Sequence, residues 1–410
     1  MMEEKKTFEL ISIASIPLIM TLGNSMLIPV LPTLEKELDI SAFQSSLIIT
    51  SYSVISIICI PIAGYLSDVI GRKKVIIPSL ILTAIGGLVA GLSPLFFKDI
   101  SYWLILLGRL LQGMGGSGAF PVVIPLVGDI FKNEKQVSSA LGVLETSNTA
   151  GKVLSPILGS LFALISWHSP FLAIPLLCLI SIVLVGGAVK APKNQTSPPP
   201  FRTFIKGIGK IFKNNGKWLI SVFIIGGVIM FVLFGTLFYL SKTLEKHYHI
   251  DGVRKGFIIA IPLFALSVAS LWTGGKIGQN KILMKWLTFL GMFLLLIAMC
   301  LLCFNPPIRL FLFYLFLGSV GIGITLPCLD AFLTEGIDKE NRGTITSLYS
   351  SMRYVGVGLG PPLFAALMKG SVFFMFLVAA GTALLAVFVS LWGIHPTPSK
   401  EKSSTEPSTN

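Results

Sequence analysis

The feature that most constrains this chain is the recurrence, along its whole length, of apolar stretches long enough to cross a lipid bilayer. A membrane-spanning helix needs about 20 mostly apolar residues, and it satisfies its own backbone hydrogen bonds where no water is available. Only 12% of the residues are charged, against roughly 25% in soluble domains. We therefore predict an all-α membrane protein with twelve transmembrane helices. The predicted spans are 9–32, 44–67, 75–97, 102–128, 137–165, 167–189, 217–241, 253–275, 283–304, 308–333, 343–367 and 371–394.

The distribution of basic residues predicts the orientation of these spans. A net charge of +13 would suit nucleic-acid binding, but most Lys and Arg residues fall in loops on one side of the predicted membrane. They include the run 72–74 and the cluster 190–217. Because cytoplasmic loops carry an excess of Lys and Arg, we expect a multi-pass protein of the cell membrane with cytoplasmic N- and C-termini. No nucleic-acid partner is expected.

A Pro-rich segment followed by a basic amphipathic stretch separates two sets of six spans. The sequence APKNQTSPPP precedes FRTFIKGIGKIFKNNGK, whose apolar and basic faces would suit a helix lying on anionic membrane lipids. A solvated linker without such a helix is the alternative. The predicted units are a six-helix bundle over 1–190, a cytoplasmic basic linker over 191–216, a second six-helix bundle over 217–395, and a disordered cytoplasmic tail over 396–410.

Two short repeats suggest that the bundles arose by duplication. The tetrapeptide TLEK occurs at 33–36, after the first span, and again at 243–246, after the seventh. GKVLSP at 151–156 in span 5 is matched by GVGLGP at 356–361 in span 11. The repeats keep their order and their places in the topology, so we expect the bundles to be related by a pseudo-twofold axis, as in many transporters.

The loop after span 2 reads GYLSDVIGRKK (64–74), and it resembles the cytoplasmic signature loop of the major facilitator superfamily. The resemblance implies a fold of two six-helix bundles, and a conformational latch formed here by Gly64, Asp68, Gly71 and Arg72. Asp129, where span 4 ends, is the expected partner of this latch, with substrate binding as the alternative. A basic run that only anchors topology is the simpler interpretation of the loop. The equivalent loop after span 8, GGKIGQNK, lacks the acidic residue.

Two further motifs are similar to those of the twelve-span drug:proton antiporters within this superfamily. Span 1 ends LGNSMLIPVLP (22–32), which contains Asn24, and span 4 contains RLLQGMGG (109–116). An unpaired charge inside the bilayer is costly, so Arg109 should face the protein interior or a hydrated cavity. The resemblance implies a role for Arg109 in proton coupling. The alternative is an Arg tied to backbone carbonyls where helices meet.

Span 5 keeps the antiporter motif only in part, because serine stands at two of its glycine positions and Lys152 lies inside it. Small residues and prolines of such motifs allow close contact between helices. The residues expected to pack helices together are Gly113, Gly151, Pro156, Gly159, Gly356, Gly360 and Pro361.

Span 5 is also unusually polar for a helix facing lipid. Glu145 and Lys152 are seven residues apart and share one face, about 10.5 Å apart along the axis. We hypothesise that Glu145 takes up and releases the coupling proton, and that Arg109 or Lys152 disfavours its protonation in one conformation. The alternative is a structural Glu near the cytoplasmic end of its helix. Arg353 in span 11 would bind either an anionic substrate group or Asp330. The expected substrate cavity comprises Asn24, Gln112, Asn148, Lys152, Tyr349 and Arg353.

These features predict a secondary active transporter rather than an enzyme, since the sequence contains no ATP-binding loop and no credible catalytic set. We expect a proton-coupled exporter of drugs or hydrophobic small molecules, and the resemblance to the superfamily implies that it works by alternating access as a monomer. The alternative is proton-coupled transport of an anionic metabolite, a sugar or a lipid-linked substrate; a non-transporting membrane receptor or scaffold is more remote. No cofactor or metal is expected, because His247 and His249 lack a third ligand nearby.

Overall fold

The computed structural model describes residues 2–131, 134–189, 201–278, 280–337 and 339–394, and within these ranges it contains helices and no strands. Twelve of the helices are long, as predicted, so the all-α membrane fold is confirmed. The first half contains α1 (Met2–Ser25), α3 (Ala42–Ile70), α4 (Arg72–Phe96), α5 (Ser101–Ile130), α6 (Glu134–Ala163) and α7 (Ser169–Ala188). The second half contains α8 (Phe201–Lys246), α9 (Gly252–Ile277), α10 (Lys281–Leu302), α11 (Ile308–Gly336), α12 (Lys339–Leu367) and α13 (Val372–Gly393).

The first predicted span is not one helix. After α1 ends at Ser25, a 3₁₀ turn (Ile28–Val30) leads into the short helix α2 (Leu31–Glu37). Pro29 and Pro32 each stand within the first two positions of these elements, where the missing N–H of proline is tolerated. Inside a continuous helix the same prolines would remove backbone hydrogen bonds, which explains the break.

The helix α8 is longer than predicted. We expected a membrane span beginning at 217 after a separate amphipathic segment, but one helix runs from Phe201 to Lys246. Residues 191–200 of the predicted linker and the predicted tail 396–410 lie outside the described residues, as do most side chains of 201–215. The predicted boundary between linker and span is therefore replaced by a continuous helix.

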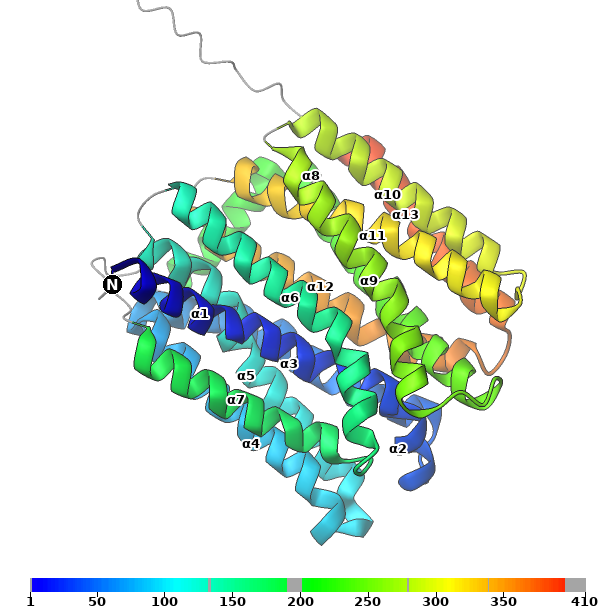
Figure 1. Cartoon of the computed structure of the whole chain (residues 1–410). Coiled ribbons are helices and arrows are strands. Elements are labelled where there is room, and N and C mark those ends of the chain that lie inside the picture. Colours follow the sequence, from blue (N-terminus) through cyan, green and yellow to red (C-terminus); the bar gives the residue numbers. More distant parts are fainter. Residues whose placement is uncertain (1, 132–133, 190–200, 279, 338, 395–410) are drawn as a thin grey trace, which may run out of the picture.

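The helices of the two halves pack in equivalent pairs, which confirms the pseudo-twofold relationship. In the first half α4 packs against α5 and α7, α3 against α5, and α1 against α6 and α7. In the second half α10 packs against α11 and α13, α9 against α11, and α8 against α12 and α13. When only the long helices are counted, each pair of the first half thus has its counterpart six helices later, and the two bundles lie side by side (Figure 1).

Two equivalent pairs, α3 with α12 and α6 with α9, form the main contacts between the halves. We call the end of the bundle that carries α2 the distal end, and the end where α1 begins the proximal end. The helices α6 and α9 converge towards the distal end and separate towards the proximal end (Figure 1). At the distal end a Cβ added to Gly256 would lie 2.5 Å from the carbonyl oxygen of Pro156, so the backbones nearly touch there.

Ten helical segments of the described residues are long and apolar enough to cross a membrane. The two remaining long helices, α6 and α12, contain Glu145, Lys152 and Arg353 in their middle regions. Both belong to the pairs that join the halves. The most polar helices therefore lie inside the assembly, where their charges are kept from lipid.

Candidate functional site

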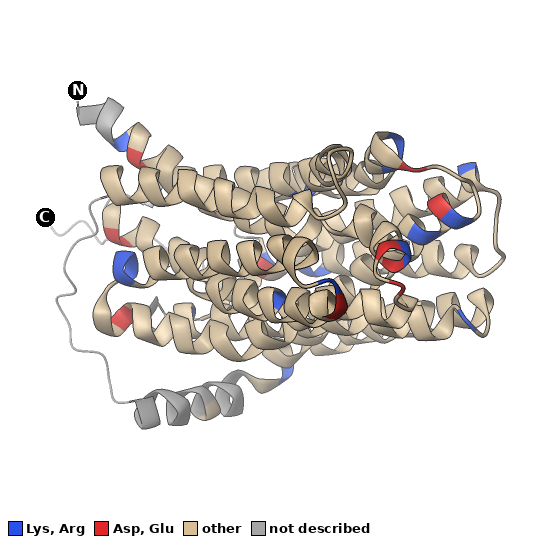
Figure 2. Ribbon diagram, turned by 90° about the horizontal axis from the view of Figure 1, so that it is seen from below, with Lys and Arg blue, Asp and Glu red and all other residues tan. Residues whose placement is uncertain are grey.

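Four charged side chains from three helices interact electrostatically near the middle of the bundle, and we call them the central charge group. Glu145 and Lys152 come from α6, Asp330 from α11 and Arg353 from α12. The Nζ of Lys152 lies 4.0 Å from Oε1 of Glu145. Asp330 interacts electrostatically with Arg353, Glu145 and Lys152. Most other charges lie towards the two ends of the bundle, with a few midway along it (Figure 2).

The central charge group faces the junction of the two halves. Glu145 and Lys152 belong to the first half, whereas Asp330 and Arg353 belong to the second, and charges on opposite lipid-facing perimeters could not interact across the bundle. The Glu145 side chain is 48% exposed and Asp330 is also exposed, while Lys152 and Arg353 are half-buried. Two carboxylates and two cations can therefore meet a solute or a proton between the halves.

Asn148 is held inside the first half by side-chain hydrogen bonds. Its Oδ1 accepts from Thr21 Oγ1 of α1 at 2.6 Å, and its Nδ2 lies 3.3 Å from each carboxylate oxygen of Glu145. Thr149 Oγ1 also donates to Glu145, at 3.4 Å. Asn148, predicted as a cavity residue, thus orients the Glu145 carboxylate and is itself buried.

Arg109 lies elsewhere, in the interior of the first half, with 0% exposure. Its Nε donates to the carbonyl of Ile48 at 2.9 Å. Nη1 donates to Gln112 Oε1 at 2.7 Å and to the Gly23 carbonyl at 3.3 Å, and Nη2 donates to Asn24 Oδ1 at 3.2 Å. The structure thus brings three predicted site residues together, but apart from the central charge group. This arrangement matches the alternative of an Arg tied to carbonyls.

Tyr52 of α3, which sequence analysis missed, extends this network to the second half. The Arg109 guanidinium lies over the Tyr52 ring, 4.6 Å from its centroid. Tyr52 in turn shares a side-chain hydrogen bond with Tyr354 of α12, and their ring centroids are 6.0 Å apart. Tyr354 is the neighbour of Arg353 in the chain, so the network ends beside the central charge group. A tyrosine in an apolar span gives no sequence signal that distinguishes this role from core packing.

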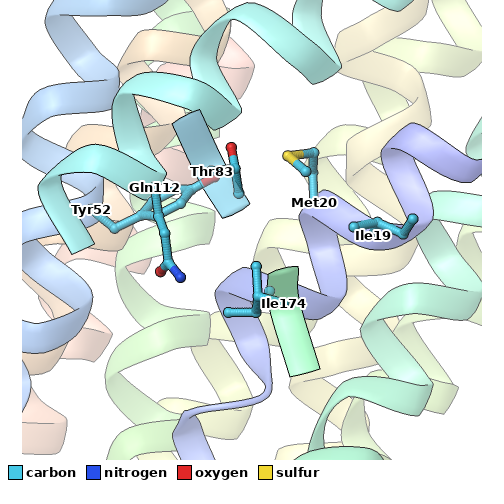
Figure 3. Close-up of a pocket in the computed structure, with 7 residues that line it drawn as sticks. Ile19, Met20, Tyr52, Thr83, Gln112 and Ile174 are labelled. Atoms are coloured by element: carbon cyan, nitrogen blue, oxygen red, sulfur yellow. The ribbon is translucent and has the colours of Figure 1, made fainter. Parts of the chain in front are cut away.

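A small cavity adjoins the Arg109 network (Figure 3). Its volume of about 10 Å³ is close to the minimum that one water molecule occupies. The lining includes Tyr52, Thr83 and Gln112, and Gln112 Nε2 has no partner among the described protein atoms. The cavity suits one hydrogen-bonded water and excludes an organic substrate.

Tyr349 packs beneath Arg353 and is itself 1% exposed. The Arg353 guanidinium lies 5.7 Å from the centroid of its ring, and Phe223 packs against it from α8. The buried Tyr349 ring therefore packs against the guanidinium and supports it. Tyr349 and Arg353 were both predicted to line the substrate cavity, but only Arg353 reaches the junction between the halves.

The predicted latch residues lie at the proximal end. Arg72, at the start of α4, is ion-paired with Asp68 and, at 3.3 Å, with Asp129 of α5. Gly71 adopts φ +102°, a conformation that side chains disfavour, and so turns the chain between α3 and α4. A Cβ on Gly64 would lie 3.1 Å from Ser347 Oγ of α12. The ion pairs thus join helices of the first half, and Gly64 supplies the contact with the second.

The predicted packing glycines stand where helix backbones approach closely. A Cβ on Gly151 would lie 3.0 Å from the Leu18 carbonyl of α1, and one on Gly360 would lie 2.6 Å from the Phe231 carbonyl of α8. The helices α1 and α8 are equivalent, so the two related hexapeptides make related contacts. The remaining close approaches join Gly113 to Tyr52, Gly159 to Met26, Gly356 to Gly227 and Pro156 to Gly256. Pro361 lies within α12.

Comparison with known proteins supports the same architecture. The solved structures include the human organic anion transporter MFSD10, with a TM-score of 0.74 and 16% identity over 94% of this chain and 99% of that one. A bacterial homologue of the human lysosomal transporter Spinster gives a TM-score of 0.75 and 15% identity over 96% and 99% of the two chains. At such low identity the likeness shows the fold.

Curated relatives share more of the sequence. The bacillibactin exporter of Bacillus subtilis is 51% identical over 396 residues, which cover 96% of this chain and 98% of that protein. The class B tetracycline resistance protein of Escherichia coli is 27% identical, covering 87% of each chain. The quinolone resistance protein NorA of Staphylococcus aureus is 24% identical, covering 90% of this chain and 92% of the relative.

A family model matches the chain in two overlapping segments, residues 13–284 and 237–409, which together span both halves. That model describes the Major Facilitator Superfamily. The chain therefore belongs to the Major Facilitator Superfamily, and it is a multi-pass membrane transporter rather than an enzyme.

Proposed function

We propose that this transporter exports bacillibactin, or a small molecule closely similar to it, from the cytoplasm. The observation that carries the proposal is the 51% identity with the bacillibactin exporter over nearly the full length of both chains. The aligned region covers 96% of this chain and therefore includes both halves. The relatives named for tetracycline and quinolone resistance are more distant, at 23–27% identity.

The central charge group is the proposed transport site. A solute bound there contacts both halves, so rocking of one half against the other would expose it alternately to each side of the membrane. Lys152 and Arg353 would hold an anionic or polar substrate group, and Tyr349 supports the arginine. In the described conformation the distal contacts of α6 and α9 close one side. We propose that the proximal side is cytoplasmic, with both termini there.

We further propose that a proton gradient drives export and that Glu145 carries the proton. Its carboxylate is exposed at the junction, close to Lys152, and is oriented by Asn148. Protonation would remove its attraction for Lys152, change the charge of the site and so bias the equilibrium between conformations. Asp330 is a second candidate carrier, because it interacts with both cations.

The transporter is further proposed to work as a monomer in the cell membrane, with the basic segment before residue 216 near anionic lipids. One chain supplies all four members of the central charge group, so no second copy is needed to complete the site.

The deciding experiment measures export in a host that makes bacillibactin but lacks its own exporter. Cells expressing this chain should lower the intracellular bacillibactin concentration and raise the extracellular one, as quantified by mass spectrometry. A protonophore should abolish the difference. Unchanged distribution, with the protein present in the membrane fraction, would refute the substrate assignment.

Drug export is the second candidate, supported by the more distant resistance proteins and by the motifs around Asn24 and Arg109. The same host should be tested for accumulation of tetracycline and of a fluorescent quinolone. Efflux of these drugs without any effect on bacillibactin would favour this second function. Efflux of both would indicate a broad substrate range.

A further inference from the structure

The repeated tetrapeptide TLEK, at 33–36 and 243–246, forms a reciprocal contact between the two halves. Lys36 Nζ lies 2.8 Å from Glu245 Oε1, and Lys246 Nζ lies 3.2 Å from Glu35 Oε2. The lysine of each copy thus binds the glutamate of the other copy. The contact joins α2 of the first half to α8 of the second, at the distal end of the bundle.

Two further lysines complete the cluster. Lys242 Nζ lies 2.9 Å from Glu35 Oε1, and Lys255 Nζ of α9 lies 2.5 Å from Glu245 Oε2. Glu35 also accepts a hydrogen bond from Ser45 Oγ at 2.7 Å. Three of the four ion pairs cross between the halves, and only the pair of Lys255 with Glu245 lies within the second half.

Burial separates this cluster from ordinary surface ion pairs, which contribute little to stability. Lys242 and Lys255 are each 2% exposed, and Glu35 and Glu245 are 7% and 8% exposed. Breaking a buried pair leaves an uncompensated charge and is strongly unfavourable. Ser241 adds a neutral contact between the halves, because its Oγ donates to the carbonyl of Ile28 at 2.8 Å.

In the four ion pairs two carboxylates face four ammonium groups, and Asp251 adds a negative charge that acts on Lys36 and Lys255. Each glutamate is the shared acceptor of two lysines, and Lys242 and Lys246 repel each other on either side of Glu35. Loss of a glutamate would therefore leave two neighbouring cations without their shared acceptor. Loss of Lys36 or Lys246 would leave the glutamate still bound to a buried lysine. The glutamates should hence control the contact far more than the exposed lysines do.

From this geometry we propose that Glu35 and Glu245, with their four lysines, form a charge latch that holds the distal ends of the halves together and opens in each transport cycle. An outward-facing state requires the distal ends to separate, and that separation must break the three pairs between the halves. The latch biases the resting transporter towards the described, distally closed conformation. It is independent of which solute occupies the central charge group.

The test measures how often the distal end opens, by the labelling rate of a buried cysteine. The reporter is Ser241→Cys, in a full-length chain whose five native cysteines are replaced, purified in detergent so that a thiol reagent reaches both faces. Ser241 is 0% exposed in the closed conformation, so labelling requires opening. Glu35→Gln and Glu245→Gln are each placed on this background. The matched control is Glu37→Gln, the same change at an exposed position two residues along α2.

We expect Glu35→Gln and Glu245→Gln to raise the labelling rate by about tenfold or more, because each removes the shared acceptor of buried cations. Lys36→Gln and Lys246→Gln should raise it by a smaller factor, about two- to threefold, since these side chains are 64% and 55% exposed. Glu37→Gln should leave it unchanged.

Two results would overturn the latch. The first is a labelling rate in both glutamate variants equal to that of Glu37→Gln, with all proteins eluting as a single species on gel filtration. The second is equal acceleration by the lysine and glutamate variants, which would indicate general loosening of the distal end. If a glutamate variant does not elute as a single species, the test rests on the two lysine variants. An unchanged labelling rate in both Lys36→Gln and Lys246→Gln would then count against the latch. None of these outcomes depends on bacillibactin export, so the latch and the proposed function can fail separately.

Discussion

The ammonium group of Lys152 lies 4.0 Å from the carboxylate of Glu145, although their positions on α6 are about 10.5 Å apart along the helix axis. The long side chains close this gap by bending towards each other on one face. Because Asp330 and Arg353 of the second half interact electrostatically with both, the charge of Glu145 acts on both sides of the junction. A change in its protonation would therefore alter the attraction between the halves.

The first prediction concerns Glu145→Gln, which keeps the shape of the side chain but cannot release a proton. We expect this variant to lose concentrative export driven by a proton gradient, because Lys152 no longer faces a group that alternates in charge. Purified protein in proteoliposomes allows substrate and proton flux to be measured together. Export at the wild-type rate, with the same dependence on the proton gradient, would exclude Glu145 as the proton carrier. Asp330 would then be the next candidate to test.

Lys152→Ala is the companion variant, since it separates two substrate classes. If the substrate presents an anionic group to the cations, we expect Lys152→Ala to weaken substrate binding by about tenfold or more, the scale of one charge-assisted hydrogen bond. If the substrate is a hydrophobic cation, Lys152→Ala should transport normally while Glu145→Gln fails. Substrate concentration dependence in the same proteoliposomes distinguishes these cases.

A second prediction follows from the four acceptors that surround Arg109. Arg109→Lys replaces a planar fork with a single ammonium group, which cannot reach all of them. Each buried acceptor left unpaired costs about 1–3 kcal/mol, so we expect a clear fall in the thermal midpoint of the purified protein. The control is Arg309→Lys at an exposed position, which should leave the midpoint unchanged. Unaltered stability with lost proton coupling would instead assign Arg109 a direct part in coupling.

Arg109 also shows how far sequence reasoning reached. The cost of an unpaired charge in a bilayer correctly placed this residue in the interior, and hydropathy located most of the long helices. The sequence did not reveal whether Arg109 faces a hydrated cavity or a packed contact between helices. Its acceptors include the Ile48 and Gly23 carbonyls, and such backbone atoms are present at every residue. Only the packing of α1, α3 and α5 determines which carbonyls turn towards the guanidinium.

The TLEK repeat shows the opposite limitation. Its duplication was visible in the sequence and correctly indicated two related halves, but the reciprocal pairing of Lys36 with Glu245 was not predicted. Sequence similarity between repeats reports ancestry, whereas contact requires both copies to lie against the pseudo-twofold axis. The break after Ser25, which brings α2 against α8, creates that contact, and it arises from the prolines at 29 and 32.

The third prediction concerns Arg72, which joins Asp68 and Asp129 at the proximal end. Arg72→Gln should leave the fold intact, because the site is partly exposed, but should slow transport by disturbing the relative positions of α3, α4 and α5. Lys74→Gln is the matched control, the same loss of charge at an exposed position two residues along α4. Equal export rates for both variants would indicate that the basic run 72–74 only fixes the orientation of the chain in the membrane.

The final prediction uses two glycines of α6 that differ in their surroundings. A Cβ on Gly159 would collide with the carbonyl oxygen of Met26, whereas one on Gly142 would meet nothing within 4 Å. The obstacle at Gly159 is the backbone of Met26, directly after the end of α1, and it cannot rotate away. Overpacking of this kind costs about 1–3 kcal/mol, while alanine in an open helix position is favoured over glycine by roughly 1 kcal/mol.

Gly159→Ala should therefore lower the thermal midpoint of the detergent-purified protein, and Gly142→Ala should leave it unchanged or raise it. The opposite signs matter because both substitutions add the same methyl group to the same helix, so differences in expression or detergent binding do not account for them. If Gly159→Ala were as stable as Gly142→Ala, α1 and α6 would have to move apart without cost. The junction beside Glu145 and Lys152 would then be less rigid than the structure indicates.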